Sequence, residues 1–337
     1  MDWSRSYSSD WRVYRVNRDT WADAERATGI DSVDITRTAD GALLESGSMT
    51  VAGGLAPDYY RIVMTAEQSG STERVDVATL LFGITGGSID YGITEGSAEG
   101  RSVLYPASVS TIVAGEFVPK KADGAEYAAG LLRKAINAPV VVEGSFELNE
   151  NLVHEIGSSV LDAVWSVLNA GGFVMQIDGK GVVHIRPKPT EPDLIIDNAS
   201  KGIMLNGIDF TSDISEIPNR YVVIDDGNIT IATNDSDTSD VSTVSRGFEV
   251  DSVDTSPTPI NGETYGEYAN RRLHELSVLE TEHSYSREFA PEVFVYSIVK
   301  ASIAELSGDL RVKSQSIKCG HGITVDEKAT EEVDLWQ

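Results

Sequence analysis

The sequence predicts a mainly β protein, α+β overall, in which a small α/β insert separates two β-rich regions. Between about residues 11 and 105, apolar residues recur at every second position, as in strands with one solvated face. From about residue 122 the apolar spacing changes to three and four, which is typical of amphipathic helices, and period two returns after residue 190. We therefore expect three domains, 1–105, 106–190 and 191–337.

The first region is expected to hold short antiparallel strands and little helix. Apolar side chains alternate with polar ones in three runs, which contain Val33 and Ile35, then Tyr60, Ile62 and Met64, then Val75 and Val77. Turn-forming steps separate these runs, at Asp40-Gly41, Gly53-Gly54, Gly70 and Gly86-Gly87. This spacing predicts a sandwich or barrel.

The second region should contain two helices followed by a hairpin. One helix is expected over 125–136, ended by Asn137 and Pro139, and another from Ser158 or Ser159 to Leu168. Ser159 and Asp162 form a cap-like pair, Gly171-Gly172 ends the second helix, and its Trp165 is predicted to be buried. Residues 173–177 and 182–185 read as strands around a turn in which Asp178-Gly179 supplies the positive φ.

Prolines 187, 189 and 192 indicate a linker, so a domain boundary is expected near residue 190. Strands are predicted over 221–224 and 229–231, with an acidic loop over 234–240 and a second loop around Pro257 and Pro259. A helix near 266–279 should precede closing strands over 293–299 and 310–317. The sheet architecture is thus expected to return in this third region.

Charge excludes several function classes. The 337 residues include 27 Lys and Arg against 53 Asp and Glu, a formal net charge of −26. Such a surplus disfavours stable binding to nucleic acid or to anionic lipid, and suits a solvated surface or a channel through which a polyanion must slide. The single cysteine excludes an intramolecular disulfide, and neither a signal peptide nor a membrane span is expected.

No residue is predicted to be catalytic, cofactor-binding or metal-binding. Cys319 and His321 lack an orienting partner, and the other four histidines have no zinc-type spacing. The loop from Asp235 to Asp240 resembles the start of a calcium loop but lacks its glycine and its closing glutamate. Phosphate-binding loops and serine elbows are absent, and none of the 53 carboxylates is singled out as a hydrolase pair. Aromatic residues near the two ends are expected to dock on the chain's own core or on a neighbouring subunit: Trp3, Tyr7, Trp11 and Trp336.

The ordered set of segments resembles the tail or baseplate hub family of tailed phages and phage-derived particles. The first tube-like barrel is represented by 31–38, 43–47, 60–64 and 74–82, and the insert by 102–107, 127–129, 161–165 and 177–179. The second barrel is represented by 218–223, 271–273 and 310–317. This resemblance spans nearly the whole chain.

The resemblance implies a structural, non-enzymatic hub with two tube-like β-barrel domains per chain. Such hubs assemble as trimers, so that six barrels match the tail tube above while threefold symmetry is offered below. The implied partners are a second and third copy, tail-tube or distal-tail ring proteins, and spike or receptor-binding tip proteins. The implied location is the tail tip of a virion assembled in the host cytoplasm. Three alternatives stay open: a tail-tube or distal-tail ring protein, a tip-associated cell-wall hydrolase, and a receptor- or carbohydrate-binding protein.

Overall fold

A computed structural model of the chain describes residues 1–52, 55–90, 93–148, 151–205, 207–225, 227–255, 257 and 263–336. The chain forms two compact units. The larger comprises residues 1–208 and 284–329, and the smaller comprises 209–283 and 330–337. The three domains expected from the sequence have other boundaries than these two units. They remain a prediction.

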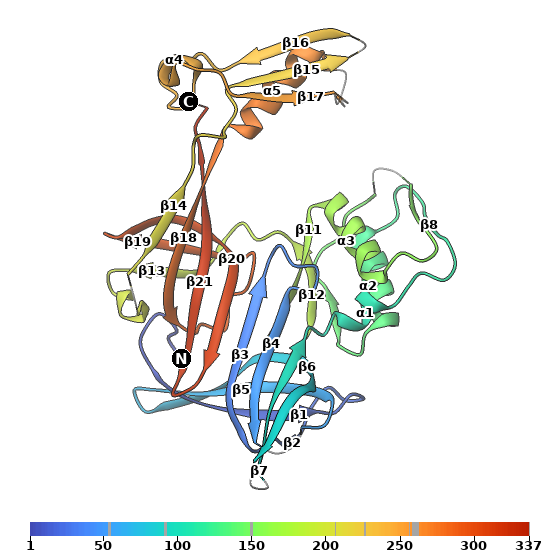
Figure 1. Ribbon diagram of the computed structural model, residues 1–337, viewed down its shortest axis with the longest axis vertical. Coiled ribbons are helices and arrows are strands. Elements are labelled where there is room, and N and C mark those ends of the chain that lie inside the picture. Colours follow the sequence, from blue (N-terminus) through green and yellow to red (C-terminus); the bar gives the residue numbers. More distant parts are fainter. Residues whose placement is uncertain are drawn as a thin grey trace. The chain divides into compact units, whose positions relative to one another are not determined.

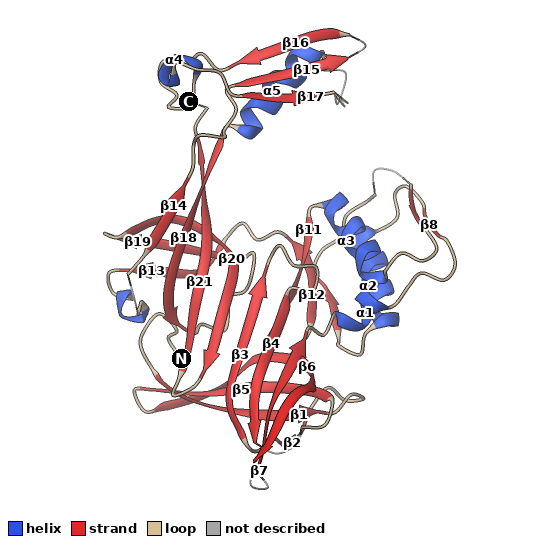
Figure 2. Ribbon diagram, viewed as in Figure 1, coloured by secondary structure: helices blue, strands red, loops and turns tan. Residues whose placement is uncertain are grey.

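The larger unit is built around one mostly antiparallel sheet (Figures 1 and 2). Its strands are β1 (Ser8–Val16), β2 (Asp23–Arg26), β3 (Ile30–Thr38), β4 (Glu45–Ala52), β5 (Asp58–Gln68), β6 (Ser71–Asp90), β7 (Ile93–Arg101), β13 (Pro192–Asp197), β18 (Val278–Glu288), β19 (Ile298–Ile303), β20 (Leu306–Cys319) and β21 (Ile323–Asp334). Residues 278–283 of β18 and 330–334 of β21 belong to the smaller unit. They are hydrogen-bonded in the order β18-β21-β20-β3-β4-β7-β6-β5-β1-β2, with β19 joining β20 to β13. The mainly β prediction is confirmed.

Strands from the two ends of the chain meet where β3 pairs with β20. Ile35 stands opposite Ile317 in this antiparallel ladder, and both side chains are fully buried. The same hydrophobic core takes in Ile62 and Leu80 from the first part of the chain and Val325 from the last. Residues before 105 and after 190 therefore share one sheet and one core.

The insert has a core of its own within the larger unit. It contains α1 (Tyr105–Val109), β8 (Glu116–Val118), α2 (Gly124–Ala135), β9 (Val140–Val142), β10 (Leu152–His154), α3 (Val160–Gly171), β11 (Phe173–Ile177) and β12 (Val183–Pro187). The short helix η1 (Lys201–Ile203) lies outside the insert, after β13. The side chains of Leu132 on α2 and Val164 on α3 are fully buried in this core. Both predicted helices and the hairpin are confirmed.

The caps of α3 are those that the sequence indicates. Ser159 accepts a hydrogen bond from the backbone N–H of Asp162 at 3.0 Å. Gly172 ends the helix with φ of 67°, in the left-handed region where glycine carries no Cβ penalty. The predicted burial of Trp165 is wrong: the indole is only half-buried, because its Nε1 reaches out to donate to the carbonyl of Ala42 at 2.9 Å.

Three further predictions, about the exposure of a strand and about two turns, are wrong. The centre of β5 is buried on both faces, because the hydrophobic core covers one face and the insert hairpin covers the other. The predicted turn at Gly86-Gly87 is absent, because β6 continues through both residues in its pairing with β7. In the insert hairpin the positive φ of 75° falls at Gly181 rather than at Gly179. Turns occur at Asp40-Gly41 and Gly70 as predicted, whereas Gly53-Gly54 lies outside the described residues.

The smaller unit is a three-stranded sheet with a helix on one face. It contains β14 (Asp209–Ser212), β15 (Arg220–Asp225), β16 (Asn228–Thr233), α4 (Thr243–Arg246), β17 (Asp251–Asp254) and α5 (Tyr265–Leu276). β15 lies between β16, which is antiparallel to it, and β17, which is parallel. A small core joins the sheet to α5 and consists of Tyr221, Val223, Ala232, Tyr268, Ala269 and Leu273.

Two boundaries in the last region differ from the prediction. The helix ends at Leu276 rather than 279, because Ser277 terminates it and Leu279 already belongs to β18. The strand predicted over 293–299 begins only at Ile298, because the side chain and backbone N–H of Ser297 form a turn with Phe294. The strands predicted at 221–224, 229–231 and 310–317 lie within β15, β16 and β20. The predicted loop around Pro257 and Pro259 lies largely outside the described residues.

Candidate functional site

A chain of buried polar side chains crosses five neighbouring strands of the large sheet. Arg37 Nε donates to Glu45 at 2.7 Å, and Arg37 Nη1 donates to Gln315 at 3.3 Å. Gln315 in turn donates to Glu327 at 2.7 Å, and Glu327 pairs with Arg287 at 2.6 Å. Together with Tyr285, which also donates to Glu327, these residues form the cross-strand ion network. It links β4, β3, β20, β21 and β18, across the join between the two ends of the chain.

On each of the two carboxyls of this network, burial raises the pKa and ion pairing lowers it. Burial raises the pKa of Glu45, although Arg37 opposes that shift. Burial also acts to raise the pKa of Glu327, but the charge and hydrogen bonds of Arg287 prevail and hold it below its usual value. The network thus depends on its two arginine–glutamate pairs, because a buried charge without its partner is strongly destabilising.

The tip of the insert hairpin is fixed to the outer face of β5 and β6. Thr79 donates to the carbonyl of Gly179 at 3.0 Å, while Arg61 and Trp21 donate to the carbonyl of Lys180 at 3.1 and 2.7 Å. A Cβ added to Gly179 would lie 1.8 Å from the carbonyl oxygen of Asp76, so only glycine permits this approach. The insert is therefore positioned by backbone contacts that depend on one glycine.

A groove of about 500 Å³ opens beside this contact and is lined by side chains of both signs. His184 on β12 bonds to Glu143 at 2.7 Å through Nδ1 and to Asp178 at 3.3 Å through Nε2. The hydrogen bond to Asp178 and then that to Glu143 raise the pKa of His184, against the effect of burial. Within the described residues, no group of three or more His, Cys, Asp or Glu side chains is placed to hold a metal ion. The groove therefore carries charges of both signs, and both carboxylates that contact His184 are hydrogen-bonded to it.

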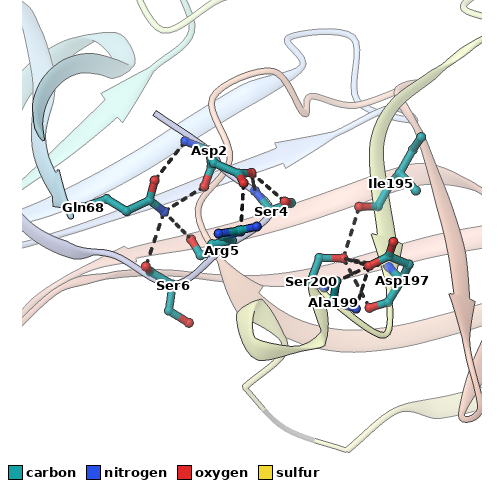
Figure 3. A network of polar contacts seen from close by, with 9 residues as sticks. All are labelled: Asp2, Ser4, Arg5, Ser6, Gln68, Ile195, Asp197, Ala199 and Ser200. Carbon is teal, nitrogen blue, oxygen red and sulfur yellow. Dashed lines mark hydrogen bonds and ion pairs between the residues drawn. The ribbon is translucent and has the colours of Figure 1, made fainter.

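The N-terminal segment is tied to β5 by one amide side chain (Figure 3). Gln68 accepts from the backbone N–H of Asp2 at 3.0 Å and donates to the carbonyls of Asp2 and Arg5 at 2.9 and 3.1 Å. Trp3 is buried in the large core and meets the ring of Tyr7 edge-on at 5.2 Å. The expectation that the N-terminal aromatics dock is confirmed for Trp3, which packs on the chain's own core.

A second hollow, of about 530 Å³, lies between this segment and the end of β13. There the carboxylate of Asp197 accepts from the backbone N–H groups of Ala199 and Ser200 at 2.8 and 3.0 Å and from the Ser200 hydroxyl at 3.1 Å (Figure 3). These backbone hydrogen bonds lower the pKa of Asp197. Because the acceptor is satisfied within its own turn, the group has a local structural role.

Cys319 and His321 do not form a catalytic pair. Cys319 ends β20 with its thiol buried, and burial followed by the charge of Asp34 raises the pKa of the thiol to about 12. His321 lies exposed on the following turn. Since the thiolate is the nucleophilic form, this cysteine has the environment of an inert buried residue.

The remaining histidines lie apart from one another and contact different partners. His154 is buried beside the ring of Tyr127, and His274 bonds to Asp334 at 3.1 Å. His283 lies 3.6 Å from Glu331. In the predicted acidic loop Asp235, Asp237 and Asp240 are exposed, whereas Ser239 turns inward to donate to the carbonyl of Leu335. The structure brings none of these residues together into one site.

Comparison with described protein families finds no match, and neither does comparison with curated protein sequences. Solved structures do match. A tail protein from Neisseria meningitidis MC58 superposes with a TM-score of 0.64 at 13% identity, over 98% of this chain and 98% of that one. The chain has the fold of this tail protein.

Two further structures share the tail-protein fold. The 43 kDa tail protein of prophage MuSo2 from Shewanella oneidensis gives a TM-score of 0.60 at 12% identity, over 95% of this chain and 97% of that one. A chain of the Francisella PdpA-VgrG complex gives 0.54 at 8% identity, over 98% of this chain but only 53% of that one. The resemblance inferred from the sequence segments is confirmed at the level of fold. No helix in the described part of the chain is long and apolar enough to cross a membrane.

Proposed function

We propose that this chain is a structural hub of a phage or phage-like tail tip or baseplate. Three copies form a ring that caps the tail tube and anchors tip or spike components around a channel for DNA. The observation that carries the proposal is the match to two tail proteins over nearly the full length of both chains. The proposal includes three domains, 1–105, 106–190 and 191–337, of which the first and last are tube-like barrels.

The insert offers a surface suited to contact between copies. Phe117 on β8 and Val153 on β10 stand opposite each other in the antiparallel pair, and their side chains are 61% and 69% exposed. Residues 106–190 carry seven Lys and Arg against nine Asp and Glu, so this region is nearly neutral despite the acidity of the whole chain. An exposed apolar surface without strong self-repulsion supports association of identical subunits.

The proposal assigns no catalytic role to any residue. The buried thiol of Cys319 and the dispersed histidines support a structural function, as does the engagement of His184 by two carboxylates. Cell-wall cleavage and receptor binding are then functions of other tail components. The virion tail tip is the proposed location, reached by assembly in the host cytoplasm.

Native mass spectrometry with negative-stain imaging of the concentrated protein tests the proposal. Threefold rings with a central hole are the expected result, and replacement of Phe117 and Val153 by serine should shift the mass towards the monomer. Val141→Ser is the matched control, since Val141 is also an exposed valine of the insert, at 41%. A monomer at every concentration, together with no binding to tail-tube rings, would contradict the proposal.

A further inference from the structure

The negative charge of this protein is concentrated in the smaller unit. Residues 209–283 and 330–337 contain 19 Asp and Glu against four Arg and no Lys, a formal charge of −15 out of the total of −26. These 83 residues are one quarter of the chain. Such a concentration raises the local attraction for cationic partners and the repulsion between copies of the unit.

The four arginines of the smaller unit are all engaged within it. Arg220 pairs with Glu249 and with Asp251, and Arg246 donates to the backbone carbonyls of Ile217 and Ile214. The remaining pairs are Arg271 with Glu263 and Glu275, and Arg272 with Glu275. Each arginine of the smaller unit therefore already has a partner within that unit. Positive charge at an interface with this unit must come from the other protein.

One face of the three-stranded sheet is apolar and lies opposite the face that α5 covers, and no helix of the described residues of the smaller unit is shown to pack on it. Along β15, Tyr221 and Val223 face α5, so Val222 and Ile224 face the other way, because side chains alternate across a strand. Val222 stands opposite Ile231 on β16 and Val253 on β17, and Ile224 stands opposite Ile229. These five residues share one face, which we call the open sheet face.

Three of the five side chains of the open sheet face are exposed to solvent, whereas Val222 at its centre is buried. Ile229, Ile231 and Val253 are 64%, 48% and 57% exposed, on the two strands that flank Val222. A cluster of β-branched side chains left in water is the mark of an interaction surface rather than of scattered surface residues. The pair of Arg220 with Asp251 closes one end of the face, since Arg220 lies two residues before Val222 and opposite Asp251.

We infer that the open sheet face binds a basic surface or segment of a different protein, one that alternates apolar and cationic side chains. The apolar side chains of the partner cover Ile229, Ile231 and Val253, while its Lys and Arg side chains are attracted by the net charge of −15 of the smaller unit. A second copy of the smaller unit is disfavoured because it would bring another charge of −15 to the interface. The inference goes beyond the proposed hub function and does not depend on ring formation.

A synthetic peptide of alternating leucine and lysine is a direct probe, and the same peptide with glutamate in place of lysine is its control. The full-length chain is labelled at its isoleucine methyl groups and titrated by NMR at low salt. The lysine peptide should shift the Ile229 and Ile231 methyl signals and leave that of Ile195, which is 54% exposed in the larger unit, unchanged. The glutamate peptide should shift none of them, and added salt should weaken the lysine peptide's binding.

Substitutions on the open sheet face distinguish the contribution of apolar contact to peptide binding from that of charge. The double variant Ile229→Ser with Ile231→Ser keeps every charge, and we expect it to weaken lysine-peptide binding about tenfold or more, because two partly exposed isoleucines lose their burial. The control Ile195→Ser should bind within about twofold of the wild type, since it lies on another unit. Unfolding curves that match the wild type would show that both variants fold.

Three outcomes would overturn the inference. Unchanged binding in the double variant would mean that charge alone attracts the peptide. Equal binding of the glutamate peptide would remove the requirement for a basic partner. Loss of self-association in the double variant, measured by sedimentation, would make a second copy the occupant. Failure of the chain to form rings would contradict the proposed hub but would leave these results unaffected.

Discussion

Replacing Arg287 with methionine tests whether the cross-strand ion network stabilises the sheet that joins the two ends of the chain. Arg287 is fully buried, and its guanidinium donates to Glu327 at 2.6 and 3.2 Å. Methionine approximates the length of the arginine side chain but has no charge. The substitution therefore leaves the Glu327 carboxyl buried with Gln315 and Tyr285 as its remaining donors.

The expected cost follows from the burial of both groups. Removing one partner of a buried ion pair costs about 3–5 kcal/mol, and the two remaining donors place this variant near the lower end. Removing both charges, with Arg287→Met and Glu327→Leu together, should cost less than the single change, because no charge is then buried without its partner. Only the neutral Tyr285 hydroxyl loses its acceptor, at about 1–3 kcal/mol, since Gln315 also donates to the carbonyl of Val293. Arg133→Met breaks an exposed pair with Glu126 and should cost less than about 1 kcal/mol.

The pH dependence gives a second, independent sign. In the wild type Arg287 holds the pKa of Glu327 below its usual 4.5, so this stabilisation is present above pH 4.5 and is lost as pH falls through the lowered value. Without Arg287, burial dominates and raises that pKa, so protonation at pH 5 should relieve part of the damage seen at pH 8. Urea unfolding followed by tryptophan fluorescence measures this, since four of the five tryptophans lie in the larger unit. A single-variant cost below about 1 kcal/mol, or a double variant less stable than the single, would refute the reasoning.

Three further changes test the insert contact, the histidine and a helix cap. Gly179→Ala should lower the melting temperature by several degrees, since its Cβ would meet the Asp76 carbonyl at 1.8 Å, whereas Gly130→Ala, with nothing within 4 Å, should be neutral or stabilise its helix by about 0.5–1 kcal/mol. His184→Gln should lower the free energy of unfolding, measured in urea, more at pH 6 than at pH 9. The raised pKa of His184 stabilises the protein fully below pH 6.5 and less as pH rises through the folded value. An equal loss of unfolding free energy at both pH values would contradict this. Thr264→Ala removes the capping box of α5 and should cost the smaller unit about 1 kcal/mol, seen as faster hydrogen exchange in α5; unchanged exchange would argue against the cap.

Features determined by nearby residues could be predicted from the sequence. The caps of α3 depend on Ser159 and Gly172, which act within one helical turn of the residues they cap. The hairpin from 173 to 185 likewise depends on a local turn, although its positive φ lies at Gly181. The role of Gly179 could not be predicted, because it comes from the approach of Asp76, about 100 residues earlier in the chain.

The cross-strand ion network was missed, although the sequence contains a signal for it. Arg37 follows Val33 and Ile35 at the inward positions of one strand, and Glu327 follows Val325 in the same way. A charged residue in such an inward series must be paired, since an unpaired buried charge is costly. The link from Arg37 to Gln315 could not be predicted, because the pairing of β3 with β20 joins residues about 280 positions apart.

The position of the charge changes what the acidity of this protein implies. Read from the sequence alone, −26 suited either a solvated surface or a channel through which a polyanion must slide. The smaller unit carries −15 of this, and the other 254 residues carry only −11. A DNA-passage role requires the acidic surface to line the channel, whereas a docking role requires it to surround the open sheet face. The two roles therefore depend on different carboxylates, and neutralising those of the smaller unit should weaken the binding of a basic partner while leaving the larger unit's own charge unchanged.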